Sequence, residues 1–197
     1  HECTYALKDE FWSRYALPRD FVLFVGTISK RKNFINLLAA MALPENLDKN
    51  LVAVTNGGDE FQAAEAYIYE HHLEDRIFFL KDLPWYELPI VYHMSQGLVY
   101  PSLYEGFGLP ILEALRCGKP VITSNVSSMP EVGGDACIFI DPNNVEEISA
   151  AINFIYYNLT LAEEVRGKAM QQVQKFAPEK MTGQLMQLYK QLLGYPA

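Results

Sequence analysis

The sequence contains no run of 18 or more apolar residues, although half of its 197 residues are apolar. A helix that spans a membrane needs about 20 such residues in a row, so no membrane-spanning helix is predicted. The apolar residues are still numerous enough to build a full core. The length and composition therefore indicate one globular domain of generous size, or one domain with appended helices.

The sequence also contains few cysteines, and its acidic residues outnumber its basic ones. Cys3, Cys117 and Cys137 make an odd number with no motif spacing, so neither a disulfide framework nor a cysteine zinc site is predicted. We expect reduced thiols, as in the cytosol. The formal net charge is −8, whereas a surface that binds nucleic acid is normally basic. We therefore expect an acidic, cytoplasmic protein that does not bind nucleic acid.

Several features of chain organisation are also missing. The chain has no linker rich in glycine or serine, no internal repeat and no low-complexity tract. It begins at His1 rather than at a methionine, and its first residues carry no recognisable signal. We expect the sequence to be a piece of a longer protein.

Short apolar runs alternate with helical segments along the chain. Strands are predicted at residues 21–25, 51–54, 76–80, 97–100, 121–123 and 137–140. Helices are predicted at residues 8–15, 33–41, 59–72, 85–94, 109–117, 145–177 in two pieces, and 179–193. Asn33 and Asp59 are the expected N-caps of two of these helices. This alternation predicts an α/β fold with a Rossmann-like, doubly wound parallel sheet.

Ligands of such sheets bind beyond the carboxyl ends of the strands. We therefore expect the loops that follow the strands to share one edge. The loop and helix after residue 100 are the most informative, because Glu105 and Glu113 both border the start of a helix. A helix N-terminus suits a phosphate, and carboxylates suit the hydroxyls of a sugar. The combination points to a sugar nucleotide.

A second loop of interest carries Lys30, Arg31 and Lys32 directly before a helix. Arg31 and Lys32 are suited to neutralising a diphosphate. The alternative interpretation is a solvated basic turn. For Glu105 and Glu113 the alternatives are a simple charge effect at a helix start, or an acid/base pair like that of glycoside hydrolases. The hydrolase alternative explains neither the cationic loop nor the helix start.

These residues resemble a known family. Residues 105–113, Glu-Gly-Phe-Gly-Leu-Pro-Ile-Leu-Glu, resemble the Glu-x7-Glu motif of retaining glycosyltransferases with the GT-B fold, of the family-4 type. Gly26-Thr27 with Arg31-Lys32-Asn33 resembles the phosphate-binding loop of that family. The surrounding pattern is similar at Pro101-Ser102, Ala114, Gly118, Pro120-Val121, Ser124 and Pro130-Glu131-Val132. The likeness extends from about Phe21 onward.

The resemblance implies a domain arrangement. In this family two Rossmann-like domains face each other across a cleft, and the C-terminal one binds the sugar nucleotide. Residues 1–20 would then be the end of the interdomain linker with a short helix, and residues 21–177 the nucleotide-sugar-binding domain. Residues 178–197 would form a helix that crosses to the missing N-terminal domain.

The resemblance also implies roles for individual residues. Glu105, Lys32 and Arg31 would be catalytic, with Glu105 touching donor-sugar hydroxyls and the two cations stabilising the departing nucleoside diphosphate. Glu113 would bind the ribose. The remaining donor-binding residues would be Gly26, Thr27, Leu83, Gly106, Phe107, Gly108 and Leu109. Many members carry arginine where this chain has Thr27, so Arg31 is expected to supply that charge.

The implied function is transfer of a hexose from a nucleotide sugar to an acceptor hydroxyl with retention of configuration. The donor would be a UDP-, GDP- or ADP-sugar, and the acceptor a glycan or lipid-linked saccharide. No Asp-x-Asp pair occurs, so neither a metal nor another cofactor is expected. The alternatives are a non-catalytic nucleotide-sugar-binding module, or an epimerase or hydrolase of similar fold.

The form Gly-Thr-x4-Lys-Asn resembles mannosyltransferase-like members of the family. The resemblance further suggests a role in polysaccharide biosynthesis, at the inner face of the membrane through the missing domain. The isolated chain is expected to bind nucleotide without transferring sugar.

Overall fold

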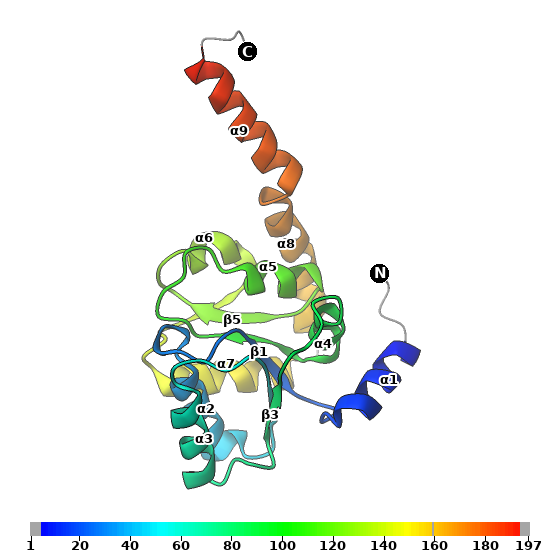
Figure 1. Cartoon of the computed structure of the whole chain (residues 1–197), viewed down its shortest axis with the longest axis vertical. Coiled ribbons are helices and arrows are strands. Elements are labelled where there is room, and N and C mark those ends of the chain that lie inside the picture. The colour runs from blue at the N-terminus through cyan, green and yellow to red at the C-terminus, as the bar shows by residue number, and fades with distance from the viewer. Residues whose placement is uncertain (1–4, 159, 194–197) are drawn as a thin grey trace.

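A computed structural model describes residues 5–158 and 160–193. Within these residues six parallel strands form one sheet in the order β3-β2-β1-β4-β5-β6 (Figure 1). The strands are β1 Val22–Val25, β2 Leu51–Val54, β3 Ile77–Leu80, β4 Gly97–Tyr100, β5 Val121–Ser124 and β6 Ile138–Ile140. The predicted Rossmann-like, doubly wound α/β fold is confirmed.

Helices connect the strands and cover both faces of the sheet (Figure 1). They are α1 Tyr5–Tyr15, α2 Phe34–Ala42, α3 Phe61–Glu70, α4 Leu88–Met94, α5 Leu109–Arg116, α6 Met129–Gly133, α7 Val145–Tyr157, α8 Leu161–Lys175 and α9 Pro178–Leu192. Short 3-10 turns occupy Lys30–Lys32, Pro44–Asn46 and Gly134–Ala136. The sequence did not predict α6 or these turns, and α4 begins at Leu88 rather than at residue 85.

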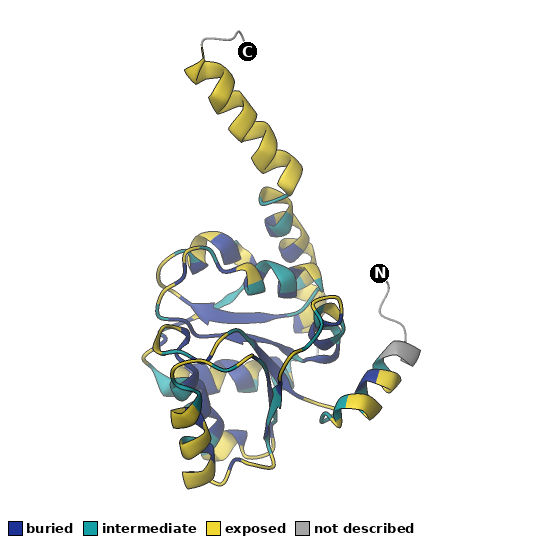
Figure 2. Cartoon of the chain, in the orientation of Figure 1, coloured by how far each residue is buried: buried dark blue, intermediate teal, exposed yellow. Residues whose placement is uncertain are grey.

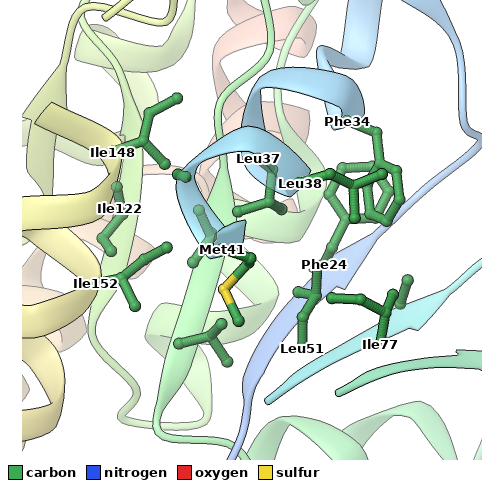
Figure 3. Packing of buried hydrophobic residues seen from close by; sticks show 14 of the residues in the cluster. Phe24, Phe34, Leu37, Leu38, Met41, Leu51, Ile77, Ile122, Ile148 and Ile152 are labelled. Atoms are coloured by element: carbon green, nitrogen blue, oxygen red, sulfur yellow. The ribbon is translucent and has the colours of Figure 1, made fainter. Parts of the chain in front are cut away.

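The core has two parts because successive strand residues point to opposite faces of the sheet. On one face, Phe24 and Leu51 belong to a cluster with side chains of α2, α3 and α7, and Figure 3 shows Phe34 beside Phe24 and Ile152 beside Ile122. On the other face, side chains of β1, β2 and β4 pack against α1, α4, α5, α6 and α8. Strands buried on both faces are typical of a parallel sheet.

Two predicted helix caps are wrong in detail. Asn33 precedes α2, but it adopts left-handed backbone angles (φ 58°, ψ 37°) and its side chain makes no cap hydrogen bond. Helix α3 begins after Glu60 rather than at Asp59, and no side chain caps it. The Asn33 amide is instead engaged by carbonyls of two other loops, as described below.

Helix α9 lies apart from the sheet and its two helix layers (Figure 1). Every described side chain of α9 is exposed (Figure 2), including those of Met181, Leu185, Met186, Leu188, Tyr189 and Leu192. Within the described residues, none of the helices combines the length and the apolarity needed to cross a bilayer. Cys3 and the chain end after Leu193 lie outside the described residues.

Candidate functional site

The loops that follow the parallel strands meet at one edge of the sheet, as the sequence predicted. The Ile28 amide donates to the Gly57 carbonyl at 2.9 Å, which joins the loops after β1 and β2. The Leu103 amide donates to the Arg31 carbonyl at 2.8 Å, which joins the loops after β1 and β4. The cationic loop and the acidic loop are therefore in direct contact.

An ion pair links these two loops. The Lys32 Nζ lies 2.7 Å from Oε1 of Glu105, and each side chain is only 9% exposed. Arg31 pairs with the other carboxylate oxygen, Oε2, at 2.5 Å and is about half exposed. The Arg31 guanidinium also donates to the Tyr104 carbonyl at 2.9 Å. Glu105 therefore holds one cation on each of its two oxygens.

The environment keeps Glu105 ionised. Burial alone would raise the pKa of its carboxyl, but Lys32, the hydroxyls of Tyr100 and Ser102, and Arg31 together lower it. Burial lowers the pKa of Lys32, while the neighbouring Glu105 opposes that shift. The carboxylate is thus stabilised by its partners rather than by water.

Tyr100, which the sequence did not single out, completes the cluster. It ends β4, and its hydroxyl accepts a hydrogen bond from Nζ of Lys32. The same ammonium lies 4.3 Å from the centre of the Tyr100 ring, within the range of a cation–π contact. Burial raises the Tyr100 pKa, so the phenol stays protonated.

The backbone around Lys32 is fixed by two residues with special conformations. Gly26 has φ +142°, and a Cβ there would lie 3.2 Å from Cε of Lys32. Asn33, in the left-handed region, donates its amide to the carbonyls of Pro101 at 3.0 Å and Pro142 at 2.7 Å. Asn33 thereby fastens the cationic turn to the loops after β4 and β6, a role that its position in the sequence did not reveal.

Two serines of the loop after β5 donate hydrogen bonds to the loop that carries Glu105. Ser127 Oγ donates to the Glu105 carbonyl at 2.7 Å. Ser128 Oγ lies 2.9 Å from the carbonyls of both Glu105 and Phe107. No sequence pattern predicted the contact of Ser127 with Glu105.

The loop opens α5 through a glycine. Gly108 has φ +104° and is the residue before the helix. Gly106 is exposed, and a Cβ added to it would meet nothing within 4 Å. Leu109 is 61% exposed, while the Phe107 ring meets Phe176 edge-on at 5.3 Å between ring centres. In the first turn of α5, Pro110 has no N–H and the Ile111 amide donates to the Gly108 carbonyl at 3.0 Å, so a ligand at the open glycine loop would face the amides of Phe107, Gly108 and Leu109.

Glu113 lies about one turn into α5, away from the ion pair. Its Oε2 accepts a hydrogen bond from the Tyr92 hydroxyl at 2.8 Å, and burial is the main reason that the pKa of Tyr92 is raised. A hollow of 450 Å³ lies beside Glu113 between α4 and α5, with Trp85 and Leu88 at its lining. The Glu113 carboxylate is half-buried and ready to accept further hydrogen bonds.

The remaining predicted residues lie at the same edge but outside the ion-pair cluster. Thr27 is exposed in the loop after β1. Leu83 follows β3 and packs against the core on the α4 side. The structure thus brings Gly26, Arg31, Lys32 and Glu105 together directly. The roles proposed for these residues, and for Leu83 and Glu113, stay predictions.

Comparison with known proteins identifies relatives of this chain. The family model described as glycosyl transferases group 1 matches residues 13–172. O-antigen chain mannosyltransferase B of Escherichia coli is 38% identical over 184 residues, which is 92% of this chain and 47% of that protein. The chain therefore spans about half the length of this curated relative.

Solved structures share the fold. Sucrose-phosphate synthase from Thermosynechococcus elongatus superposes with a TM-score of 0.82 and 29% identity, covering 94% of this chain and 49% of that one. The C-terminal domain of a glycosyl transferase group 1 family protein from Francisella tularensis gives a TM-score of 0.72 at 20% identity. It covers 85% of this chain and 91% of that domain. The six-stranded sheet with its flanking helices is one half of a GT-B fold, and the chain belongs to the glycosyl transferases group 1 family.

Proposed function

We propose that this chain is the C-terminal, donor-binding domain of a retaining glycosyltransferase. The observation that carries the proposal is the ion pair between Lys32 and Glu105, which joins a cationic turn to a helix start at the ligand-binding edge. The Francisella tularensis neighbour, which is itself a C-terminal domain, supports the assignment of this half. The name of the Escherichia coli relative supports a glycosyl donor.

The site offers each part of a sugar nucleotide a complementary group. Lys32, Arg31 and the backbone amides of Phe107, Gly108 and Leu109 bind the diphosphate. Glu113, held by Tyr92, accepts hydrogen bonds from the ribose hydroxyls. Glu105 contacts donor-sugar hydroxyls and at the same time orients both cations. The backbone of Leu83 meets the base.

The reaction follows from where charge develops. The bond between the anomeric carbon and the phosphate oxygen breaks, and the electron pair leaves with the diphosphate. The acceptor oxygen bonds to that carbon on the same face, and its proton passes to the leaving phosphate. Lys32, Arg31 and the backbone amides of residues 107–109 are fixed before the reaction and stabilise the leaving group, an effect worth about 3–4 kcal/mol for one such donor in other enzymes. We propose that no metal is needed.

The proposed donor carries mannose, and the proposed acceptor is a growing surface polysaccharide or lipid-linked saccharide. Support comes from the mannosyltransferase relative and from the Gly-Thr-x4-Lys-Asn turn. The acceptor side belongs to an N-terminal domain, against which the exposed apolar side chains of α9 would pack. By this proposal residues 1–197 bind nucleotide but do not transfer sugar, and the full protein works in the cytoplasm at the membrane face.

The test is calorimetric titration of residues 1–197 with GDP, UDP and ADP. Lys32→Ala should weaken the preferred nucleotide by about 1.5–3 kcal/mol, or roughly 10- to 150-fold, because a charge-assisted hydrogen bond is lost. Lys30→Ala is the matched control, since Lys30 lies in the same turn and is exposed. Equal affinity in the Lys32→Ala variant and the unmodified chain would contradict the proposed role.

A further inference from the structure

A second concentration of positive charge lies near the C-terminal end of α5, away from the ion pair of Lys32 and Glu105. A hollow of 430 Å³ is bordered by four helices or their ends, and we call it the basic hollow. Its charged lining is Lys8 of α1, His93 of α4, Arg116 of α5, Lys119 of the turn after α5, and Glu163 and Arg166 of α8. Four cations thus surround one carboxylate in a chain whose net charge is −8.

The basic hollow and the ion pair of Lys32 and Glu105 lie at opposite edges of the sheet. Lys119 lies two residues before β5, whereas the loops of the ion pair follow the carboxyl ends of the strands. Arg116 is the last residue of α5, and the glycine loop of the donor site opens the same helix. Eight helical residues span about 12 Å, so one helix separates the two places.

Part of the positive charge at the basic hollow stabilises the fold. Helices α4 and α5 both end here, and cations near helix C-termini are stabilising. Lys119 Nζ donates to the Ser95 carbonyl just beyond α4, at 2.7 Å. That explanation does not extend to Arg166, because α8 does not end at the hollow.

The two arginines are available to a ligand. Arg116 and Arg166 are exposed, and neither forms an ion pair within 4.0 Å across residues 5–158 and 160–193. The pKa of His93 is lowered by its surroundings. Burial lowers its pKa first, and the charges of Lys119 and Lys8 lower it further. An anion would relieve this mutual repulsion.

We propose that the basic hollow binds a phosphate-bearing anion. The guanidinium groups of Arg116 on α5 and Arg166 on α8 offer the donors that a tetrahedral oxyanion accepts, and the ammonium groups of Lys8 and Lys119 add positive charge beside them. The phosphate belongs either to a soluble ester or to the headgroup of an anionic lipid. Both sources present the same charged oxygens to the same side chains, so the experiment separates them.

The first arm uses inorganic phosphate and the histidine ring signals of residues 1–197 in NMR spectra. Phosphate should shift the His93 signal and raise the pKa of His93, because the anion stabilises the imidazolium. The exposed His71 and His72 serve as internal controls and should not shift. Arg116→Gln/Arg166→Gln should weaken phosphate binding at least about tenfold, since charge-assisted hydrogen bonds are lost.

A matched control removes two exposed lysines outside the hollow. Lys168→Gln/Lys180→Gln loses the same charge from α8 and α9, and affinity should stay within about twofold, since isolated exposed charges contribute little. His93 and Arg116 also border the hollow beside Glu113, so a further variant, Lys32→Ala, separates the basic hollow from the donor site. Lys32 does not line the basic hollow, so the phosphate response of His93 should persist in Lys32→Ala. A missing response in the unmodified chain, with nucleotide still bound in calorimetry, would overturn this proposal and leave the proposed nucleotide site standing.

The second arm measures sedimentation with vesicles of phosphatidylglycerol against vesicles of phosphatidylcholine. Binding to phosphatidylglycerol that Arg116→Gln/Arg166→Gln abolishes identifies a lipid headgroup as the source. A His93 response to phosphate without vesicle binding identifies a soluble phosphate. If the unmodified chain shows neither response, or if both paired variants lose binding equally, the proposal is overturned.

Discussion

The ammonium of Lys32 and the carboxylate of Glu105 lie 2.7 Å apart in an almost solvent-free setting, and they come from the loops after β1 and β4. These strands are neighbours in the sheet but distant in the sequence. The ion pair therefore fixes the positions of these two loops relative to each other. Breaking a buried ion pair by removing one partner typically costs about 3–5 kcal/mol, because an unpaired charge remains.

Glu105→Gln should lower the free energy of unfolding by about 3 kcal/mol, the low end of that range. The low end is expected because burial already lowers the pKa of Lys32, which eases its neutralisation, and because Arg31 keeps contact with water. Urea unfolding followed by circular dichroism measures the change. Glu65→Gln is the control, since Glu65 is exposed on α3, and a loss no larger than the control's would refute the structural role.

The same pair predicts how stability depends on pH. The pKa of Glu105 is lowered in the folded chain relative to its ordinary value of 4.5, so the unfolded chain binds more protons in acid. Its contribution is fully present above pH 4.5 and is lost as the pH falls through the folded pKa. Urea unfolding at stepped pH should show that the gap between the unmodified chain and Glu105→Gln narrows below pH 4.5. A constant gap down to strong acid would contradict this linkage.

Much of this arrangement was predictable from the sequence. Apolar runs and their alternation with helices predicted the parallel sheet and the edge at which Lys32 and Glu105 meet. What the sequence did not reveal were contacts made by ordinary residue types from distant segments. Tyr100 is merely the last residue of an apolar strand, and Ser127 lies in an unremarkable loop, yet both contact the cluster.

The error at Asn33 has a clear physical reason. An asparagine before an apolar helix is a typical N-cap, but asparagine also tolerates left-handed backbone angles better than most residues. Tertiary carbonyls from Pro101 and Pro142 compete successfully for its amide. A prediction from the local sequence pattern cannot include a hydrogen-bond acceptor, such as the Pro101 carbonyl, that lies more than 60 residues away in the sequence.

Asn33 therefore offers a test with two substitutions. Asn33→Ala should destabilise the chain by about 3 kcal/mol, since two hydrogen bonds to buried carbonyls are lost and alanine is strained at φ 58°. Asn33→Gly should recover about 1 kcal/mol of that loss, because glycine adopts this conformation freely. Both values come from urea unfolding.

The control for Asn33 is Asn36→Ala, which removes a single hydrogen bond to Pro142 at 3.1 Å and should cost about 1 kcal/mol. Both Asn33 variants should also weaken nucleoside diphosphate, since the turn that carries Lys32 loses its anchor. If Asn33→Gly were as costly as Asn33→Ala, the left-handed backbone would not contribute.

Substitutions at two glycines of the site distinguish a glycine needed for the fold from a glycine needed for donor binding. Gly26→Ala places a methyl group 3.2 Å from Cε of Lys32 at φ +142°, so it should cost at least about 1 kcal/mol of stability and displace the ammonium. Gly106→Ala meets nothing within 4 Å, and its free energy of unfolding should match that of the unmodified chain. If a donor phosphate or sugar approaches that loop, Gly106→Ala will nevertheless bind nucleotide sugar more weakly in calorimetric titration. Unchanged binding in Gly106→Ala would mean that the donor does not contact this glycine, and the proposed path of the donor over the loop would have to be abandoned.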